Sequence, residues 1–410
     1  MKKILSSVFL LSLILSACAQ QAATASNPSV RPTPTIKIII PTPASCTSMG
    51  AAPTPGAEEP SLFPPVTDKD HVRGAKNPVF TVMDYSDYQD PRSALFFEAA
   101  DQLLKENPDT VQVVSRIFPL VSINDKAAIA AQAAEAAAEQ NKFWEMHDLL
   151  YKQQANWIGL SPTDFEKWVT AQATGLGLDV KKFKTDLKRN DIVARVQQAW
   201  EDGQKMGLPG TPLVLLNRQI YGGPRDYNSL NDILQLIVLG KRQFTACPPV
   251  TVESNKQYIA TLHTERGDVV IQLFADKAPF TVNSFLFLAK NGWYDNITFH
   301  RVIPDLFAQT GDPSGTGKGN PGYYVVTEID PKLKFDRPGM VGMVNSGPDT
   351  SGSQFFITYG PASQFDGKYT IFGQVLSGMD VLQQLTPRDA KPGEATPPGD
   401  KLLSITIEEK

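Results

Sequence analysis

The C-terminal part of the chain shows two strand-like apolar segments followed by a helical pattern. Residues 258–263 and 269–274 are the two segments, and the polar turn 264–267 separates them. This pattern predicts a β-hairpin. A helix is expected next, because Pro279 suits a first helical turn and Gly292 can end the helix. The apolar residues between them recur at helical spacing: Val282, Phe285, Leu286 and Ala289.

The region before this hairpin combines strand and helix signals. Residues 79–85 are rich in apolar and aromatic side chains, which predicts a strand. Residues 126–139 are rich in alanine, which favours a helix. Ser161 stands three residues before Asp164, the spacing of a helix N-cap. We therefore expect an α/β domain with several helices.

The N-terminus carries a short apolar run behind two basic residues. The run covers residues 4–15 and ends in Leu15-Ser16-Ala17-Cys18. A membrane span needs about 20 apolar residues, so this run is too short for one. It resembles a bacterial lipoprotein signal, which implies a diacylated Cys18 on a membrane outside the cytoplasm. An ordinary secretory signal with an incidental cysteine is the alternative. Ala19 and Gln20 provide no aspartate retention signal, which favours an outer membrane where the organism has one.

Composition separates a connecting tether from the folded regions. Proline, alanine, serine and threonine dominate the tether, which predicts disorder, although residues 36–40 are apolar. The 410 residues are 41% hydrophobic, which is enough for two domains with cores, and the net charge of −4 leaves no basic footprint for nucleic acid. The expected parts are a signal (1–18), the tether (19–70), an α/β domain (71–245), a linker (246–256) and a β-rich domain (257–410).

Three strings in the β-rich domain point to one kind of site. They are FHRVIPDLFAQTGD at 299–312, MVNSGPDTSGSQFFITYG at 343–360 and FDGKYTIFGQV at 365–375. Together they resemble the active face of a cyclophilin. The resemblance implies a closed β-barrel capped by helices and a peptidyl-prolyl cis-trans isomerase without metal, nucleophile or cofactor.

Site residues follow from this resemblance position by position. It assigns catalytic roles to Arg301, Gln309 and Asn345. It assigns substrate binding to Leu306, Phe307, Val344, Gln354, Phe356, Gln364, Phe365 and Tyr369. Taken singly, Arg301 would read as a surface residue at a strand end and the phenylalanines as core, but the joint pattern favours a site.

Three of these positions depart from the best-known eukaryotic pattern. Gln364 replaces tryptophan or another aromatic residue, Tyr369 replaces histidine and Leu306 replaces phenylalanine. Gln364 makes the pocket rim more polar. We therefore expect reduced activity and weaker cyclosporin binding.

The reaction itself explains why an arginine is needed. Rotation about an X-Pro bond faces a barrier of about 18–20 kcal/mol, because amide resonance is lost as the bond twists. The prolyl nitrogen then gains basicity, so a fixed cationic donor binds the twisted state better than either planar isomer. Arg301 is the candidate donor, since its guanidinium stays charged and offers a planar fork of donors.

The α/β region resembles the thioredoxin fold, in particular the DsbA-like group. The resemblance rests on DYSDYQDPRSA from Asp84, NKFWEMHDLLY from Asn141 and GLPGTPLVLLNRQIYGG from Gly207. It places the family's redox cysteines at Asp90 and Ser93 and its cis-proline loop at Thr211-Pro212. Thiol–disulfide exchange requires a thiolate, so we expect a redox-silent domain with a helical insertion.

Two roles remain open for this domain. The groove beside Pro212 could hold an extended polypeptide by backbone pairing. The alternative is a spacer or a dimerisation module.

The cysteines predict one disulfide bond, and the positions of the histidines argue against a metal site. After lipidation of Cys18, Cys46 and Cys247 remain, and such a pair in an extracytoplasmic protein predicts a disulfide. The four histidines are scattered and form no ligand-spacing cluster.

The sequence thus predicts a lipid-anchored isomerase that acts on exported polypeptides with X-Pro bonds. A holdase that grips proline segments without turnover is the first alternative, and Gln364 favours it. A thiol–disulfide oxidoreductase is the second, and the missing Cys-x-x-Cys opposes it. Client proteins and the oligomeric state stay open.

Overall fold

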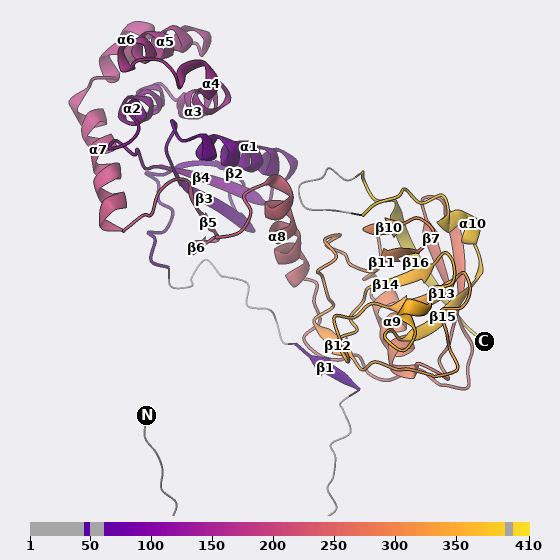
Figure 1. Ribbon diagram of the computed structural model, residues 1–410. Helices are drawn as coiled ribbons and strands as arrows, with labels where there is room; N and C mark the ends of the chain where they lie inside the picture. Colours follow the sequence, from indigo (N-terminus) through magenta and orange to yellow (C-terminus); the bar gives the residue numbers. More distant parts are fainter. Residues whose placement is uncertain (1–44, 50–60, 390–396) are drawn as a thin grey trace, which may run out of the picture. The chain divides into compact units, whose positions relative to one another are not determined.

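The computed structural model describes residues 45–49, 61–389 and 397–410 (Figure 1). The expected lipoprotein signal with Cys18 and the apolar segment 36–40 lie outside the described residues. No helix among the described residues is long and apolar enough to cross a membrane.

The first domain is built on a five-stranded sheet with the strand order β2-β4-β3-β5-β6. β3 and β4 run parallel, and the other neighbours are antiparallel. The expected strand at 79–85 is β3. The strands are β2 (His71–Gly74), β3 (Phe80–Ser86), β4 (Val111–Ile117), β5 (Leu213–Leu216) and β6 (Gln219–Ile220).

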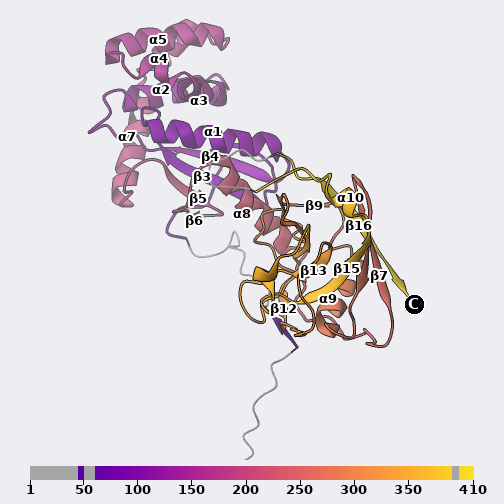
Figure 2. The same ribbon diagram turned by 45° about the vertical axis from the view of Figure 1, so that its right-hand side comes forward.

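Helices cover both faces of this sheet because its strands alternate two sets of apolar residues. Phe80 and Val82 belong to one face, which packs against α1 (Pro91–Glu106) and α8 (Tyr227–Gly240). Met83 and Tyr85 belong to the other face, where Trp200 of α7 (Asn190–Lys205) and the segment containing Phe63 pack. The result is a three-layered α/β arrangement (Figures 1 and 2).

A helical insertion follows β4 and has its own core. Seven of the alanines of α2 are buried, which lets the neighbouring helices approach closely. Ser161 caps α5 as expected, since its side chain accepts a hydrogen bond from the Asp164 amide. The insertion comprises α2 (Ala127–Ala138), α3 (Phe143–Lys152), α4 (Gln154–Trp157), α5 (Pro162–Gly175) and α6 (Val180–Asp186), and it leads into α7.

The carboxyl group of Asp84 is buried without a cationic hydrogen-bond partner. Asp84 lies in β3 and is 7% exposed. Ser86 donates a hydrogen bond to its Oδ2. Burial raises the pKa of Asp84 to about 6, although Ser86 and the more distant charge of Arg73 oppose the rise. Asp84 therefore carries its charge at neutral pH at a cost to stability.

The second domain is an antiparallel sheet of nine strands that curls around a core. Its order is β10-β11-β14-β13-β15-β8-β7-β16-β9. The expected hairpin is β7 and β8, and the expected helix is α9. The elements are β7 (Tyr258–Thr264), β8 (Gly267–Leu273), α9 (Pro279–Lys290), β9 (Ile297–Thr298), β10 (Arg301–Ile303), β11 (Phe307–Thr310), β13 (Met340–Met343), β14 (Phe355–Thr358), β15 (Ile371–Ser377), α10 (Met379–Leu382) and β16 (Lys401–Glu409). The predicted architecture of an α/β domain followed by a helix-capped β-barrel domain is confirmed.

The strands of this sheet send alternate side chains into two apolar clusters. In β14, Phe355 and Ile357 belong to the inner core, together with Val282 and Phe285 of α9. Phe356, between them, belongs to a separate cluster on the other face. The second cluster, which we call the outer cluster, is the part of the fold that positions the site.

Part of the segment expected as a disordered tether is ordered. β1 (Cys46–Ser48) pairs with β12 (Tyr323–Val325) of the second domain. A disulfide with an S–S distance of 2.08 Å joins Cys46 to Cys247. Both cysteines pack against the inner core of the second domain. Phe63 is also ordered, because its ring is buried on the sheet of the first domain.

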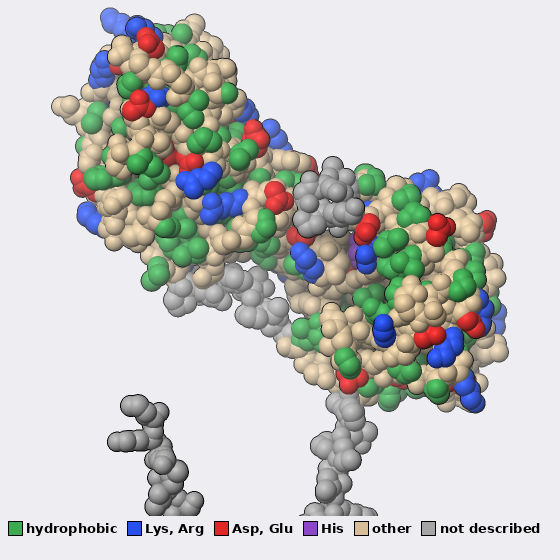
Figure 3. All heavy atoms as spheres, in the orientation of Figure 1, with side chains coloured by type: hydrophobic (Ala, Val, Ile, Leu, Met, Phe, Trp, Pro, Cys, Tyr) green, Lys and Arg blue, Asp and Glu red, His purple; other side chains and the backbone are tan. Residues whose placement is uncertain are grey.

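Charged side chains are spread over the surface of both domains. On the face in Figure 3, blue Lys and Arg side chains alternate with red Asp and Glu side chains. No extended patch of a single sign covers the described part of that face.

Candidate active site

The outer cluster is an apolar surface formed where four adjacent strands and two loops meet. Six of its residues are buried: Phe307, Phe335, Met340, Phe356, Ala362 and Ile371. Phe307 comes from β11, Phe356 from β14, and Phe335 from the loop before β13. Partly buried side chains surround them: Phe274, Ile303, Leu306, Leu333, Val344, Phe365 and Tyr369.

Phe356 is the centre of the aromatic packing. Its ring centroid lies 5.7 Å from that of Phe307, 5.3 Å from that of Phe365 and 5.4 Å from that of Tyr369. The Phe365 and Tyr369 rings meet edge to face at 5.5 Å. These contacts hold the rings in fixed orientations. Such a surface suits a small apolar ring such as that of proline.

A row of polar side chains crosses the strands beside this cluster. Arg301 of β10 lies opposite Gln309 of β11 in the strand register. Gln309 donates a hydrogen bond of 2.9 Å to Gln354 Oε1. Gln354 in turn donates to the carbonyl oxygens of Gly317 and Gly319 at 3.1 and 2.9 Å. The two glutamines are therefore fixed, and each places its amide next to the apolar surface.

Arg301 lies at the edge of the outer cluster. Its guanidinium carbon is 5.3 Å from the centroid of the Phe307 ring, within the range of a cation–π contact. Its Nε donates a hydrogen bond of 2.7 Å to Asp389. The Arg301 side chain is 45% exposed and the Asp389 side chain 43% exposed. An ion pair this exposed contributes only about 0–1 kcal/mol to stability, and it engages Nε, so the two terminal amino groups stay accessible to a substrate.

The residue before Arg301 adds no charge to the site. His300 is buried. Burial lowers the pKa of His300, and the positive charges of Arg388 and Arg301 act in the same direction against that of Asp312. The imidazole is thus neutral at neutral pH, and it adds no positive charge beside Arg301.

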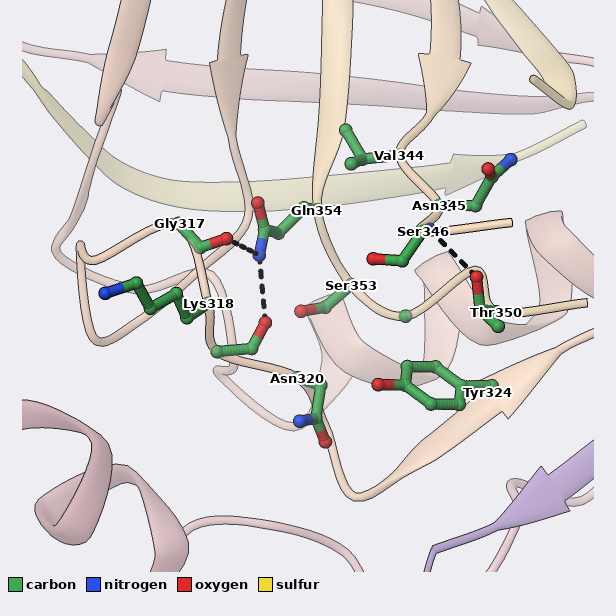
Figure 4. A pocket seen from close by; sticks show the side chains of 12 residues that line it. Gly317, Lys318, Asn320, Tyr324, Val344, Asn345, Ser346, Thr350, Ser353 and Gln354 are labelled. Atoms are coloured by element: carbon green, nitrogen blue, oxygen red, sulfur yellow. Dashed lines mark hydrogen bonds between the residues drawn. The ribbon is translucent and has the colours of Figure 1, made fainter. Parts of the chain in front are cut away.

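A polar pocket of about 310 Å³ adjoins Gln354. Val344, Asn345 and Gln354 line it together with Lys318 and Tyr324, and Figure 4 shows these side chains around the opening. The pocket can hold side chains of a peptide that extends beyond the outer cluster.

The remaining predicted site residues lie around these two features. Asn345 donates to the Lys368 carbonyl oxygen at 2.9 Å, which fixes its side chain and leaves its backbone at the pocket. Gln364 lies exposed in the 3-10 turn Ser363–Phe365 and takes no part in the outer cluster. The structure thus brings the predicted apolar residues together in the outer cluster, with Arg301, Gln309 and Gln354 beside it, and leaves Gln364 exposed. Their individual roles stay predictions.

Sequence reasoning missed several residues of the site. Phe335 stacks on Phe356 at 5.4 Å, but it lies in a loop without periodicity. Met340 and Ile371 read as ordinary strand residues. Asp389 also gave no signal, because it follows the last helical turn in an irregular segment. The alternation within β13 and β15 could have placed Met340 and Ile371 on the outer face.

The second domain is similar to known proteins. Residues 259–407 match the family model described as cyclophilin type peptidyl-prolyl cis-trans isomerase/CLD. The chain is 48% identical over 125 residues to peptidyl-prolyl cis-trans isomerase-like 1 of Aspergillus fumigatus, covering 30% of this chain and 78% of that protein. The chain belongs to the cyclophilin family. The cyclophilin domain is therefore a peptidyl-prolyl isomerase.

Two further relatives extend the comparison. Peptidyl-prolyl cis-trans isomerase-like 1 of Aspergillus niger is 43% identical over 150 residues, which cover 36% of this chain and 93% of that protein. A crystal structure of a cyclophilin type peptidyl-prolyl cis-trans isomerase from Cryptosporidium parvum is 34% identical, covers 37% of this chain and 98% of that chain, and has a TM-score of 0.34.

The first domain matches a second family. Residues 66–235 match the family model described as thioredoxin. Asp90 caps α1, accepting hydrogen bonds from the Arg92 amide at 3.0 Å and from Thr211 Oγ1 at 2.6 Å. Ser93 is 1% exposed, and the Thr211–Pro212 peptide is cis. The two expected redox positions, Asp90 and Ser93, therefore lie at the start of α1, and Asp90 contacts the loop that contains Pro212. Neither an aspartate nor a serine provides a thiolate.

Metal ligation has no candidate site in this chain as far as it is described. Within residues 45–49, 61–389 and 397–410, no group of three or more His, Cys, Asp or Glu side chains could hold a metal ion.

Proposed function

We propose that the cyclophilin domain isomerises X-Pro bonds in unfolded or partly folded exported proteins, on a chain held to a membrane by a lipid at Cys18. The observation that carries the catalytic part is the position of Arg301. Its guanidinium lies beside Phe307, at the edge of an apolar surface that suits a prolyl ring.

The proposed mechanism assigns one task to each part of the site. The proline ring packs on Phe307 and Phe356, which excludes water from the bond that rotates. Arg301 donates toward the prolyl nitrogen as that nitrogen becomes basic. Gln309 and Gln354, fixed by their mutual hydrogen bond, hold the substrate backbone. No bond to the protein forms or breaks, so catalysis comes from binding the twisted state most tightly.

A proline-limited refolding assay tests this assignment with Arg301→Ala. Loss of a preorganised donor costs roughly 10²–10³ in rate. The matched control is Arg195→Ala, since Arg195 has a side chain of 47% exposure in the other domain. The control should refold the substrate as fast as the wild-type protein does. Equal rates for Arg301→Ala and wild type would contradict the catalytic role of Arg301.

A holdase is the second candidate, because the exposed Gln364 stands where the family pattern has an aromatic residue. The same assay distinguishes the two functions. A holdase suppresses aggregation of the refolding protein without accelerating the proline-limited phase, so an unchanged slow phase with reduced light scattering would favour it.

The extracytoplasmic location is supported by the Cys46–Cys247 disulfide, because such bonds persist in oxidising compartments. Lipidation is tested by Cys18→Ala. We expect the wild-type protein in the membrane fraction of a bacterial host and the variant in the soluble fraction, with labelled fatty acid incorporated by the wild type alone. Equal fractionation and no label in either protein would leave an ordinary secretory signal.

For the thioredoxin-like domain we propose a redox-silent role in substrate capture beside Pro212. The hydrogen bond from Thr211 to Asp90 supports this, because it ties the cis-proline loop to α1 without a thiol. An insulin-reduction assay should show no activity. Crosslinking of an unfolded polypeptide to residues beside Pro212 would support capture, and its absence would favour a spacer or dimerisation role.

A further inference from the structure

A short segment after α10 lies beside the strand that carries Arg301. Val302 donates its amide to the Arg388 carbonyl oxygen at 2.6 Å, and Arg388 donates its amide back to Val302 at 2.8 Å. This pair of hydrogen bonds is an antiparallel bridge at the edge of the sheet. Asp389 follows the bridge directly and therefore lies beside Arg301. Its Oδ1 accepts a hydrogen bond of 2.7 Å from Arg301 Nε.

The segment is held in place by residues other than Asp389. Asp400 accepts from the Thr386 amide at 2.5 Å and from Arg266 Nε at 2.7 Å. Arg388 donates from its side chain to the carbonyl oxygens of His300 at 3.2 Å and Pro397 at 2.5 Å. Residues 386–388 are therefore anchored by contacts that a change at Asp389 leaves intact.

The contact with Asp389 engages the Nε of the Arg301 guanidinium. Within the described residues, Nε is the Arg301 nitrogen that has a hydrogen-bond partner. Asp389 holds this nitrogen from one side while the Phe307 ring lies 5.3 Å from the guanidinium carbon. The two terminal amino groups are left for the substrate. A planar group fixed at Nε and against a ring has little freedom to rotate.

Two opposite effects of the carboxylate on catalysis can be compared. Its negative charge weakens the field of Arg301, but an ion pair of this exposure changes an equilibrium by about fivefold at most. Its hydrogen bond orients the donor, and misplacement of a catalytic group by about 1 Å can cost about 100-fold in rate. Orientation is therefore the larger effect.

We propose that Asp389 is a positioning residue, which holds the Arg301 guanidinium in the orientation that serves the rotating bond. This inference rests on the proposed catalytic role of Arg301. Asp389 belongs neither to the outer cluster nor to the row of glutamines. It acts on the substrate through Arg301.

The test compares Asp389→Ala and Asp389→Asn with the wild-type chain on an X-Pro peptide, with kcat and KM measured separately. We expect Asp389→Ala to lower kcat about tenfold and to leave KM within about twofold, because orientation matters most in the twisted state. Asp389→Asn should recover most of the loss, since its amide oxygen still accepts from Nε. The matched control is Asp191→Ala, because Asp191 accepts from Arg189 Nε at 2.6 Å in the other domain.

A double-mutant cycle separates positioning from a structural effect. In an Arg301→Ala background, Asp389→Ala should change kcat by less than about twofold, because the group it positions is gone. Thermal unfolding should be the same for all Asp389 variants, as expected for an exposed side chain.

The outcomes separate this inference from the proposed function. If Arg301→Ala loses activity but Asp389→Ala matches the wild type, the positioning role is overturned and the catalytic role of Arg301 stands. If Asp389→Ala is faster than the wild type, the carboxylate competes with substrate and positioning is likewise overturned. If Arg301→Ala is as active as the wild type, the proposed catalytic role fails first.

Discussion

Replacement of Asp84 by asparagine should stabilise the thioredoxin-like domain at neutral pH. Asp84 is buried in β3, with Ser86 as its hydrogen-bond donor. Its pKa rises from 3.8 to about 6 on folding, because burial disfavours the charged form. At about 1.36 kcal/mol per pKa unit, this difference corresponds to about 3 kcal/mol. The asparagine side chain carries no charge at any pH and keeps an oxygen that accepts from Ser86.

The sign follows from proton binding in the two states. Between pH 3.8 and about 6 the folded protein holds the Asp84 proton while the unfolded chain has lost it. Stability therefore falls as the pH rises through this window, and it stays low above it. The advantage of Asp84→Asn should thus be absent below pH 3.8 and complete above about pH 6.

Calorimetry of the full chain at several pH values measures this effect. For a domain of this size, about 3 kcal/mol shifts Tm by roughly 6–12 °C. The difference in Tm between the variant and the wild type should therefore grow by that amount from about pH 4 to about pH 8, in the transition of the thioredoxin-like domain. The control Asp202→Asn, on an exposed side chain, should show a difference independent of pH. A difference for Asp84→Asn that stays constant or shrinks as the pH rises would refute the reasoning.

Two further predictions concern the cyclophilin site. Gly342→Ala should lower kcat/KM about tenfold and cost about 1–3 kcal/mol of stability, because its Cβ would come 2.5 Å from the Phe356 ring. Peptide kinetics measure kcat/KM and thermal unfolding measures stability. Unchanged kinetics would contradict this prediction. Gln364→Trp should tighten cyclosporin binding at least about tenfold by adding an aromatic wall at the exposed rim; titration calorimetry measures it, and an unchanged Kd would show that Gln364 does not limit binding.

Local periodicity was enough to predict the elements that carry the site. The two apolar segments on either side of the turn 264–267 form the β7–β8 hairpin, and the residues at helical spacing after Pro279 form α9. These segments were predictable because each buries one face, so that the apolar pattern reports the secondary structure directly.

The sequence could not predict elements whose partners are distant. β1 is short and lies in a proline-rich stretch, and it is a strand because β12 and the disulfide to Cys247 hold it. Phe335 reaches the outer cluster from a loop, and Asp389 reaches Arg301 through the backbone bridge at Arg388. Such contacts depend on tertiary structure, which local sequence propensity does not predict.

The site residues divide in the same way. The strings around Arg301 and Gln354 placed a cation and fixed amides beside an aromatic surface, and the structure brings them together. The hydrogen bond that holds the arginine from the other side comes from 88 residues further along the chain. The alternating pattern of β11 and β14 predicts which face of the sheet each side chain occupies. It does not predict a contact with a residue of an irregular segment, such as Asp389.

Exchange spectroscopy on an X-Pro peptide tests the central claim most directly, because it measures the cis–trans rate and peptide binding on the same sample. Arg301→Ala should slow enzyme-catalysed exchange by roughly 10²–10³ while the peptide still binds the outer cluster with a Kd within about tenfold of the wild type. Exchange as fast in Arg301→Ala as in the wild-type protein would contradict the claim that this guanidinium stabilises the twisted bond.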